Sequence, residues 1–150
     1  MKPIHLLLLT AAFFASSCVS TKSTLQNVDD TAPVPKLTAA NTFIINQYSS
    51  DPKYGYDKDY PINVYYKNAK EETNNAQRFL NALAGPKGES ISYKKLESCC
   101  PFPTKHTEMG AGFLDVYELS WQGQPSPTKL YINKYEKSIL MVPKGLTLKR

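Results

Sequence analysis

The sequence predicts an α+β domain in which an antiparallel sheet, ending in a four-stranded meander, packs against one amphipathic helix. Three observations support this fold class. Alternating apolar and polar residues recur at short spacing in the second half of the chain. One stretch with helical spacing precedes them, at residues 68–84. A chain of 150 residues has room for one such domain and a tail.

The first elements expected in the domain are two strands separated by a loop. Residues 42–48 and 61–66 are rich in β-branched and aromatic side chains, which favour strands. Between them, Asp51-Pro52 and Gly55 indicate turns. The domain is therefore expected to start near residue 41.

The predicted helix has signals at both ends. Asn68 can cap its N-terminus, and Glu71 stands three residues later, as in a capping box. Gly85 followed by Pro86 is typical of a helix end. Its apolar residues are expected to pack against the sheet: Ala76, Phe79, Leu80 and Leu83.

Four strands are expected after the helix, at residues 90–98, 113–121, 128–136 and 138–142. In the second of them, odd-numbered and even-numbered side chains would point to opposite faces of the sheet. Consecutive strands at short spacing usually pair as neighbours, so an antiparallel meander is expected. The single helix must then cover its apolar face.

The first 17 residues have the features of a secretory signal peptide. Lys2 supplies a positive charge, and the apolar run that follows is shorter than the roughly 20 residues of a membrane-spanning helix. Ala15-Ser16-Ser17 directly before Cys18 resembles the bacterial lipobox. The resemblance implies cleavage before Cys18 and acylation of that cysteine, with palmitate or similar chains as a membrane anchor.

Residues after Cys18 bear on location and organisation. Val19, rather than Asp, follows the cysteine; by resemblance to lipoprotein sorting, this implies the outer membrane, facing the periplasm. Residues 18–40 are mostly small and polar, with isolated apolar residues, and are expected to be a flexible linker. Residues 41–150 would form the single domain.

The charge of the chain is mildly basic. The formal net charge is +5 and the lysines are scattered, without a run of like charges. A scattered excess of this size is typical of a solvated surface, so no nucleic-acid partner is predicted.

Cys99 and Cys100 are the only cysteines after Cys18, and an oxidising compartment permits disulfides. Their Cα atoms would be about 3.8 Å apart, below the usual disulfide range. Pro101 is expected to hold Cys100 extended, which turns the two side chains to opposite faces. The alternatives are structural thiols, a vicinal disulfide, and a redox or metal role with His106. Two adjacent cysteines and one histidine fall short of a zinc site, so no metal or cofactor is predicted.

Tyrosines form the other concentration of functional side chains. Six of the ten lie between Tyr48 and Tyr66, among several aspartates. Aromatic faces beside carboxylates can bind glycans or peptides, and tyrosines can equally pack over a sheet. The candidate ligand-binding residues are Tyr54, Tyr56, Tyr60 and His106.

Five sequence motifs, spread over nearly the whole chain, resemble a family of small bacterial lipoproteins. They are NVDD, KYGYDKDYPINV, ESCCPFPTK, MGAGFLDVYEL and KLYIN. Members of that family often carry the name 2-dehydro-3-deoxyphosphooctonate aldolase. Such aldolases are (β/α)8 barrels of about 250 residues, so the length and element pattern of this chain argue against that activity.

Two classes of function follow from the sequence. The first is an envelope lipoprotein that acts as a binding or structural module, with an envelope protein or a glycan as partner. The second is an enzyme or thiol-redox factor centred on Cys99, Cys100 and His106. The first is favoured, because local spacing is the only observation that supports the second.

Overall fold

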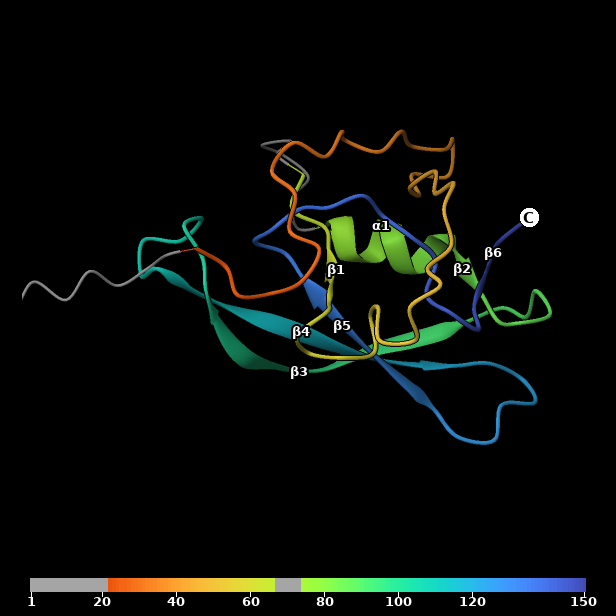
Figure 1. Ribbon diagram of the computed structural model, residues 1–150. Coiled ribbons are helices and arrows are strands. Elements are labelled where there is room, and N and C mark those ends of the chain that lie inside the picture. The colour runs from red at the N-terminus through yellow and green to blue at the C-terminus, as the bar shows by residue number, and fades with distance from the viewer. Residues whose placement is uncertain (1–21, 67–73) are drawn as a thin grey trace, which may run out of the picture.

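The computed structural model describes residues 22–66 and 74–150 (Figure 1). Cys18 and the predicted helix start, with Asn68 and Glu71, lie outside the described residues. Within those ranges, no helix has the length and apolar character needed to cross a membrane.

The α+β class is confirmed, and the main sheet has four strands in the order β1-β5-β4-β3. They are β1 (Ile62–Asn63), β3 (Ser92–Pro103), β4 (Ala111–Ser120) and β5 (Thr128–Asn133). The last three form the expected antiparallel meander.

The fourth strand of this sheet differs from the prediction. β1 pairs in parallel with β5 and occupies the edge expected for residues 138–142. Those residues instead run beside residues 47–49, where Val142 N donates to Gln47 O at 2.8 Å. The predicted strand at 42–48 likewise makes only isolated bridges, although Phe43 and Ile45 are buried.

One helix, α1 (Asn75–Ala82), lies on the sheet (Figure 1). It ends where β2 (Leu83–Ala84) begins, and β2 pairs with β6 (Thr147–Leu148) in a small second sheet. The predicted apolar stripe is buried as expected: Ala76, Phe79, Leu80 and Leu83 belong to the main core. Asn75 fixes the helix start, because its amide donates to Val64 O and Tyr66 O.

The buried side of β4 changes halfway along the strand. Tyr117 and Leu119 point to one face and join the core under α1. Leu114 and Val116, on the opposite face, are also buried but lie outside that core. Under the helix, the buried face of the sheet is the one that α1 covers. Near the β3–β4 hairpin, the buried face is the opposite one.

Packing at the hairpin half depends on Gly112. A Cβ atom on this residue would lie 2.7 Å from Tyr135 Cδ2, which is too close for any side chain. Phe102 and Tyr135 pack edge to face over the glycine, with ring centroids 6.1 Å apart. Tyr135 thereby brings the segment after β5 onto the hairpin.

Residues 22–40, where the sequence predicted a linker, lie against the domain in the structure. Gln26 N donates to Asp59 O at 2.9 Å, and Asp29 N donates to Lys137 O at 2.8 Å. Ala32 is only 2% exposed. Local composition does not reveal such contacts, because they are hydrogen bonds to distant backbone rather than burial of an apolar face.

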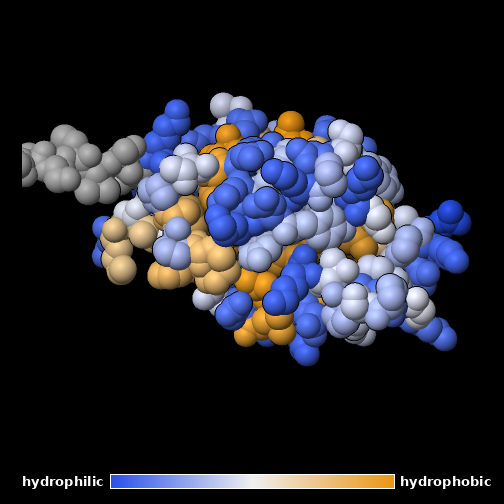
Figure 2. All heavy atoms as spheres, turned by 60° about the horizontal axis from the view of Figure 1, so that its bottom comes forward, coloured by the Kyte–Doolittle hydropathy of each residue, from blue (hydrophilic) through white to orange (hydrophobic). Residues whose placement is uncertain are grey.

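The underside of the sheet carries charged groups. Figure 2 shows hydrophilic side chains over much of this view, with hydrophobic ones among them. Exposed Lys94 and Lys129 flank the partly exposed Glu118 on neighbouring strands, with Lys94 Nζ 2.9 Å from Glu118 Oε1. Beneath the helix the sheet thus solvates its other face, whereas Leu114 and Val116 on that face are buried nearer the hairpin.

Candidate functional site at the hairpin cleft

Four segments that are distant in the sequence meet beside the β3–β4 hairpin. Tyr65 N donates to Glu136 O at 2.8 Å, which joins the segment after β1 to the segment after β5. The bond from Asp29 N to Lys137 O adds the N-terminal segment. His106, in the hairpin, stacks on Tyr65 with ring centroids 4.9 Å apart. The backbone and this stacking together bring polar side chains into one cleft.

His106 and Glu136 form the buried part of the cleft. The side chain of Glu136 is 3% exposed and that of His106 is 18% exposed. His106 Nδ1 lies 3.3 Å from Glu136 Oε2. Nevertheless Nδ1 has no hydrogen-bond partner, because its direction does not fit a hydrogen bond to that oxygen. The imidazole and the carboxylate therefore face each other away from solvent without a hydrogen bond between them.

Asp30 and Lys105 form an ion pair at the mouth of the cleft. The hydrogen bond from Lys105 is the main cause of the lowered pKa of Asp30, and the charges of Lys105 and Lys137 act in the same direction. The pKa of Lys105 is raised in return, mainly by its bond to Asp30. Both side chains are about half exposed, so the ion pair contributes little stability and an incoming ligand can separate it.

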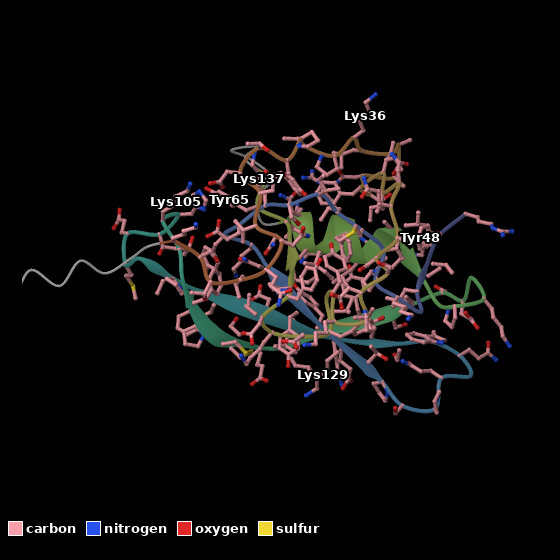
Figure 3. All side chains as sticks on the ribbon, in the orientation of Figure 1. Lys36, Tyr48, Tyr65, Lys105, Lys129 and Lys137 are labelled. Carbon is pink, nitrogen blue, oxygen red and sulfur yellow. A yellow bond between two sulfur atoms is a disulfide. The ribbon has the colours of Figure 1, made fainter. Side chains whose placement is uncertain are left out.

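Two cavities lie on either side of the Asp30–Lys105 pair. One of about 340 Å³ has aromatic and cationic walls, which include Tyr65, Tyr66 and Lys137, with His106 at its base. The other, of about 480 Å³, reaches Glu136 from beneath the N-terminal segment. Figure 3 shows Tyr65, Lys105 and Lys137 gathered at this end of the molecule. We refer to the two cavities together as the hairpin cleft; volumes of this size suit small ligands or single groups of a polymer.

The structure brings only one of the four predicted ligand-binding residues, His106, to the cleft. Tyr54 is fully buried in the core, and its hydroxyl accepts a hydrogen bond from Met141 N at 3.2 Å. Tyr60 packs edge to face on Tyr54. Tyr56 donates to Lys144 O, and burial raises its pKa to about 12. These three tyrosines thus pack the loop between residues 48 and 61 onto the core. Packing of this kind was the alternative to ligand binding that the sequence allowed.

Cys99 and Cys100 are joined in a vicinal disulfide, with their Cα atoms 3.7 Å apart. Cys100 is not extended as predicted, since its φ is +58°. The register of β3 against β4 shifts between Cys99 and Pro101, so Cys100 is the extra residue of a β-bulge. The bulge turns Cys100 out of the alternating pattern, which lets the two sulfurs meet on the same side. Neither cysteine lines the hairpin cleft.

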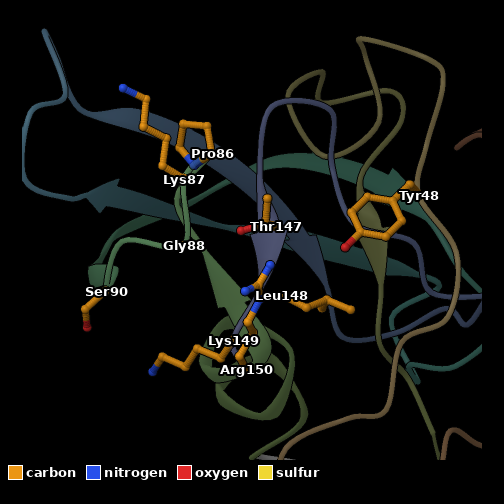
Figure 4. Close-up of a pocket in the computed structure, with 9 residues that line it drawn as sticks. All are labelled: Tyr48, Pro86, Lys87, Gly88, Ser90, Thr147, Leu148, Lys149 and Arg150. Carbon is orange, nitrogen blue, oxygen red and sulfur yellow. The ribbon is translucent and has the colours of Figure 1, made fainter.

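A larger cavity, of about 580 Å³, lies at the other end of the molecule (Figure 4). Tyr48 stands on one side of it, and the charged residues of its wall are Lys87, Lys149 and Arg150. All three cations are exposed surface side chains. This cavity therefore resembles a solvated basic surface more than a built site, unlike the cleft with its buried Glu136.

Comparison of the chain with known protein families, characterised proteins and solved structures gives no match.

Sequence reasoning missed Asp30, Tyr65 and Glu136 as site residues. Asp30 lies in the predicted linker, and Glu136 lies at the end of a predicted strand, where a carboxylate is expected to be solvated. The one local signal was Lys105-His106, next to the prolines and glycines of the hairpin. The other residues join it only through long-range backbone hydrogen bonds.

Proposed function

We propose that this protein is a lipid-anchored envelope protein whose domain is a binding module, with the hairpin cleft as its binding site. The observation that carries the proposal is the buried Glu136–His106 pair, whose histidine lines the cavity with aromatic and cationic walls and whose glutamate lines the neighbouring cavity. Burying a carboxylate is costly unless it is paired, and His106 Nδ1 faces Glu136 at 3.3 Å without a hydrogen bond to it. Anchoring is supported by the lipobox resemblance at Cys18.

The walls of the cleft indicate a glycan or a peptide-bearing glycan as ligand. Tyr65 offers a partly exposed aromatic surface, while Lys105, Lys137 and Asp30 offer both signs of charge. A few polar groups on an apolar wall fix a ligand's orientation and give specificity. A polymer that carries both sugars and charged peptides, such as the wall of a bacterial envelope, has this chemistry.

A binding role is favoured over thiol chemistry by the state of the cysteines. Sulfurs joined to each other supply no thiolate nucleophile, and they line neither cavity at His106. The aldolase activity suggested by the name of similar lipoproteins is not proposed, because an antiparallel meander with one short helix lacks the architecture of a (β/α)8 barrel.

Two measurements test the two parts of this proposal. For anchoring, cells that express the protein are fed radiolabelled palmitate; label is expected on the wild type and absent from Cys18→Ala. For binding, the purified lipoprotein in detergent is sedimented with insoluble cell-wall sacculi. Tyr65→Ala and Lys137→Ala should each reduce the bound fraction, whereas Tyr48→Ala, which removes an exposed tyrosine at the other end, should not. Label on Cys18→Ala, or equal sedimentation of all four proteins, would refute the corresponding part.

A further inference from the structure

We propose that Asp30, His106 and Glu136 form a site for a divalent cation of the zinc type. One ligand atom from each of these side chains lies within 4.8 Å of the other two. The inference deepens the proposed function, because it assigns a first ligand to the same cleft. It does not depend on the glycan, since the cation contacts the base of the cleft and the glycan would contact its walls.

The donor set fits such an ion. Imidazole nitrogens and carboxylate oxygens both bind Zn²⁺, and sites with three protein ligands keep a water molecule in the fourth position. Bonds of about 2.0–2.1 Å in a tetrahedral site place neighbouring ligand atoms about 3.3 Å apart. The distance from His106 Nδ1 to Glu136 Oε2 is 3.3 Å. Two of the three donors thus already have the separation that a shared ion requires.

An independent observation is the orphaned nitrogen of His106. Nδ1 is shielded from solvent and lacks a hydrogen-bond partner, while the carboxylate that it faces is almost fully buried. A buried polar atom without a partner costs free energy comparable to a lost hydrogen bond. A cation between Nδ1 and Oε2 would give Nδ1 a partner and place a positive charge beside the buried carboxylate.

The surroundings hold these donors in place. Tyr65 stacks on the imidazole, and His106 N donates to the side-chain oxygen of buried Thr104 at 3.2 Å, so both the ring and its backbone are supported. The backbone of Glu136 is held by its bond from Tyr65 N. Supporting contacts of this kind tune metal sites and contribute to their affinity.

Lys105 is the natural competitor of the ion. It is bonded to Asp30, and it is 57% exposed, so it can swing into solvent when a cation arrives. A cation must displace this positive charge to reach the Asp30 carboxylate. Removal of the lysine charge should therefore strengthen cation binding, whereas removal of a ligand should weaken it.

The test is calorimetric titration of ZnCl₂ into the purified, chelator-treated lipoprotein in detergent. We expect one Zn²⁺ per chain. His106→Gln and Glu136→Gln should each weaken binding by more than about 100-fold, because loss of even an outer-shell partner costs 10–100-fold. Asp30→Asn should also weaken Zn²⁺ binding. Glu108→Gln, a change at an exposed carboxylate of the same hairpin, is the matched control and should bind as the wild type does.

Lys105→Met is the decisive variant, because it keeps the length of an exposed side chain and should tighten Zn²⁺ binding several-fold. A purely structural role of the ion pair would not produce a gain. The inference is overturned if the wild type binds no Zn²⁺, if His106→Gln and Glu136→Gln bind as Glu108→Gln does, or if Lys105→Met does not bind more tightly. Sacculus binding by the same wild-type sample tests the proposed function separately, so failure of one is distinguishable from failure of the other.

Discussion

Lys95 Nζ lies 2.8 Å from Asp115 Oδ1 across the β3–β4 ladder. Asp115 itself is only 5% exposed. Ser98 Oγ donates to the same oxygen at 2.8 Å, and Lys134 Nζ approaches the other oxygen at 3.2 Å. Burial alone would raise the pKa of Asp115, but the bonds from Lys95, Ser98 and Lys134 outweigh it, so the pKa is lowered. Asp115, in β4, thus connects electrostatically with β3 and with the residue that follows β5.

Asp115→Asn should lower the free energy of unfolding at pH 7 by about 1–3 kcal/mol, because it removes the negative charge and one of the two acceptor oxygens that two lysines and a serine share. The sign of the pH dependence follows from the lowered pKa. The stabilisation is fully present above the unfolded pKa of about 3.9 and is lost as the pH falls through the lower folded value. Urea titrations between pH 2 and 7 should therefore show the two proteins converging in acid. A constant difference at every pH would contradict this assignment.

Leu80→Ala should destabilise the domain by about 2–5 kcal/mol, because Leu80 is 1% exposed in the core between α1 and the sheet. Gln77→Ala changes an exposed position on the same helix and should be close to neutral. Urea unfolding of both variants measures the contrast. Equal midpoints would mean that α1 does not pack on the sheet through this face.

Gly112→Ala should cost about 1–3 kcal/mol, because the new methyl group would overlap the ring of Tyr135. Ser120→Ala, at an exposed position of the same strand, is the control for strand propensity. Since Tyr135 precedes Glu136, displacement of the ring should also disturb the cleft. The chemical shifts of His106 in the variant would report that disturbance; unchanged shifts together with unchanged stability would show that the close approach does not exist.

Mature protein should show no free thiol before reduction, because Cys18 is expected to be acylated and the other two cysteines are joined. Reduction should expose two thiols and raise the mass by about two hydrogens. Detection of two reactive thiols in the unreduced protein would exclude the disulfide. Catalytic reduction of insulin, lost on replacement of either cysteine, would instead support the thiol-redox alternative.

The backbone of the bulge gives a matched comparison that does not need the disulfide. Cys99→Ser/Cys100→Gly should be more stable than Cys99→Ser/Cys100→Ser by about 1–2 kcal/mol, because glycine adopts a φ of +58° without steric cost. Thermal or urea unfolding measures the difference. A serine variant as stable as the glycine variant would indicate an extended Cys100, as the following proline had suggested.

The meander and the helix stripe could be predicted because each has a local signal. Alternation identified β3, β4 and β5, and the spacing of Ala76, Phe79 and Leu80 identified the buried face of α1. The parallel edge strand β1 could not be predicted, because two residues of pairing leave no period in the sequence. The bulge at Cys100 ran against the usual effect of a following proline.

The cleft was less accessible to sequence reasoning than the fold. His106 was a candidate because histidine is rare in this chain and lies in a hairpin with prolines and glycines. Asp30 and Glu136 become site residues only through two backbone hydrogen bonds. One joins residue 29 to residue 137, and the other joins residue 65 to residue 136. Such bonds use main-chain atoms, which every residue possesses, and so leave no signature in residue type.

The most direct test of the central claim is a crystal structure of the protein grown with Zn²⁺, with anomalous data collected at the zinc absorption edge. The account predicts one strong anomalous peak about 2.0–2.2 Å from His106 Nδ1 and from carboxylate oxygens of Asp30 and Glu136, with Lys105 turned into solvent. A structure in which Asp30 lies away from the hairpin, or in which zinc binds elsewhere while His106 and Glu136 stay as they are, would contradict it.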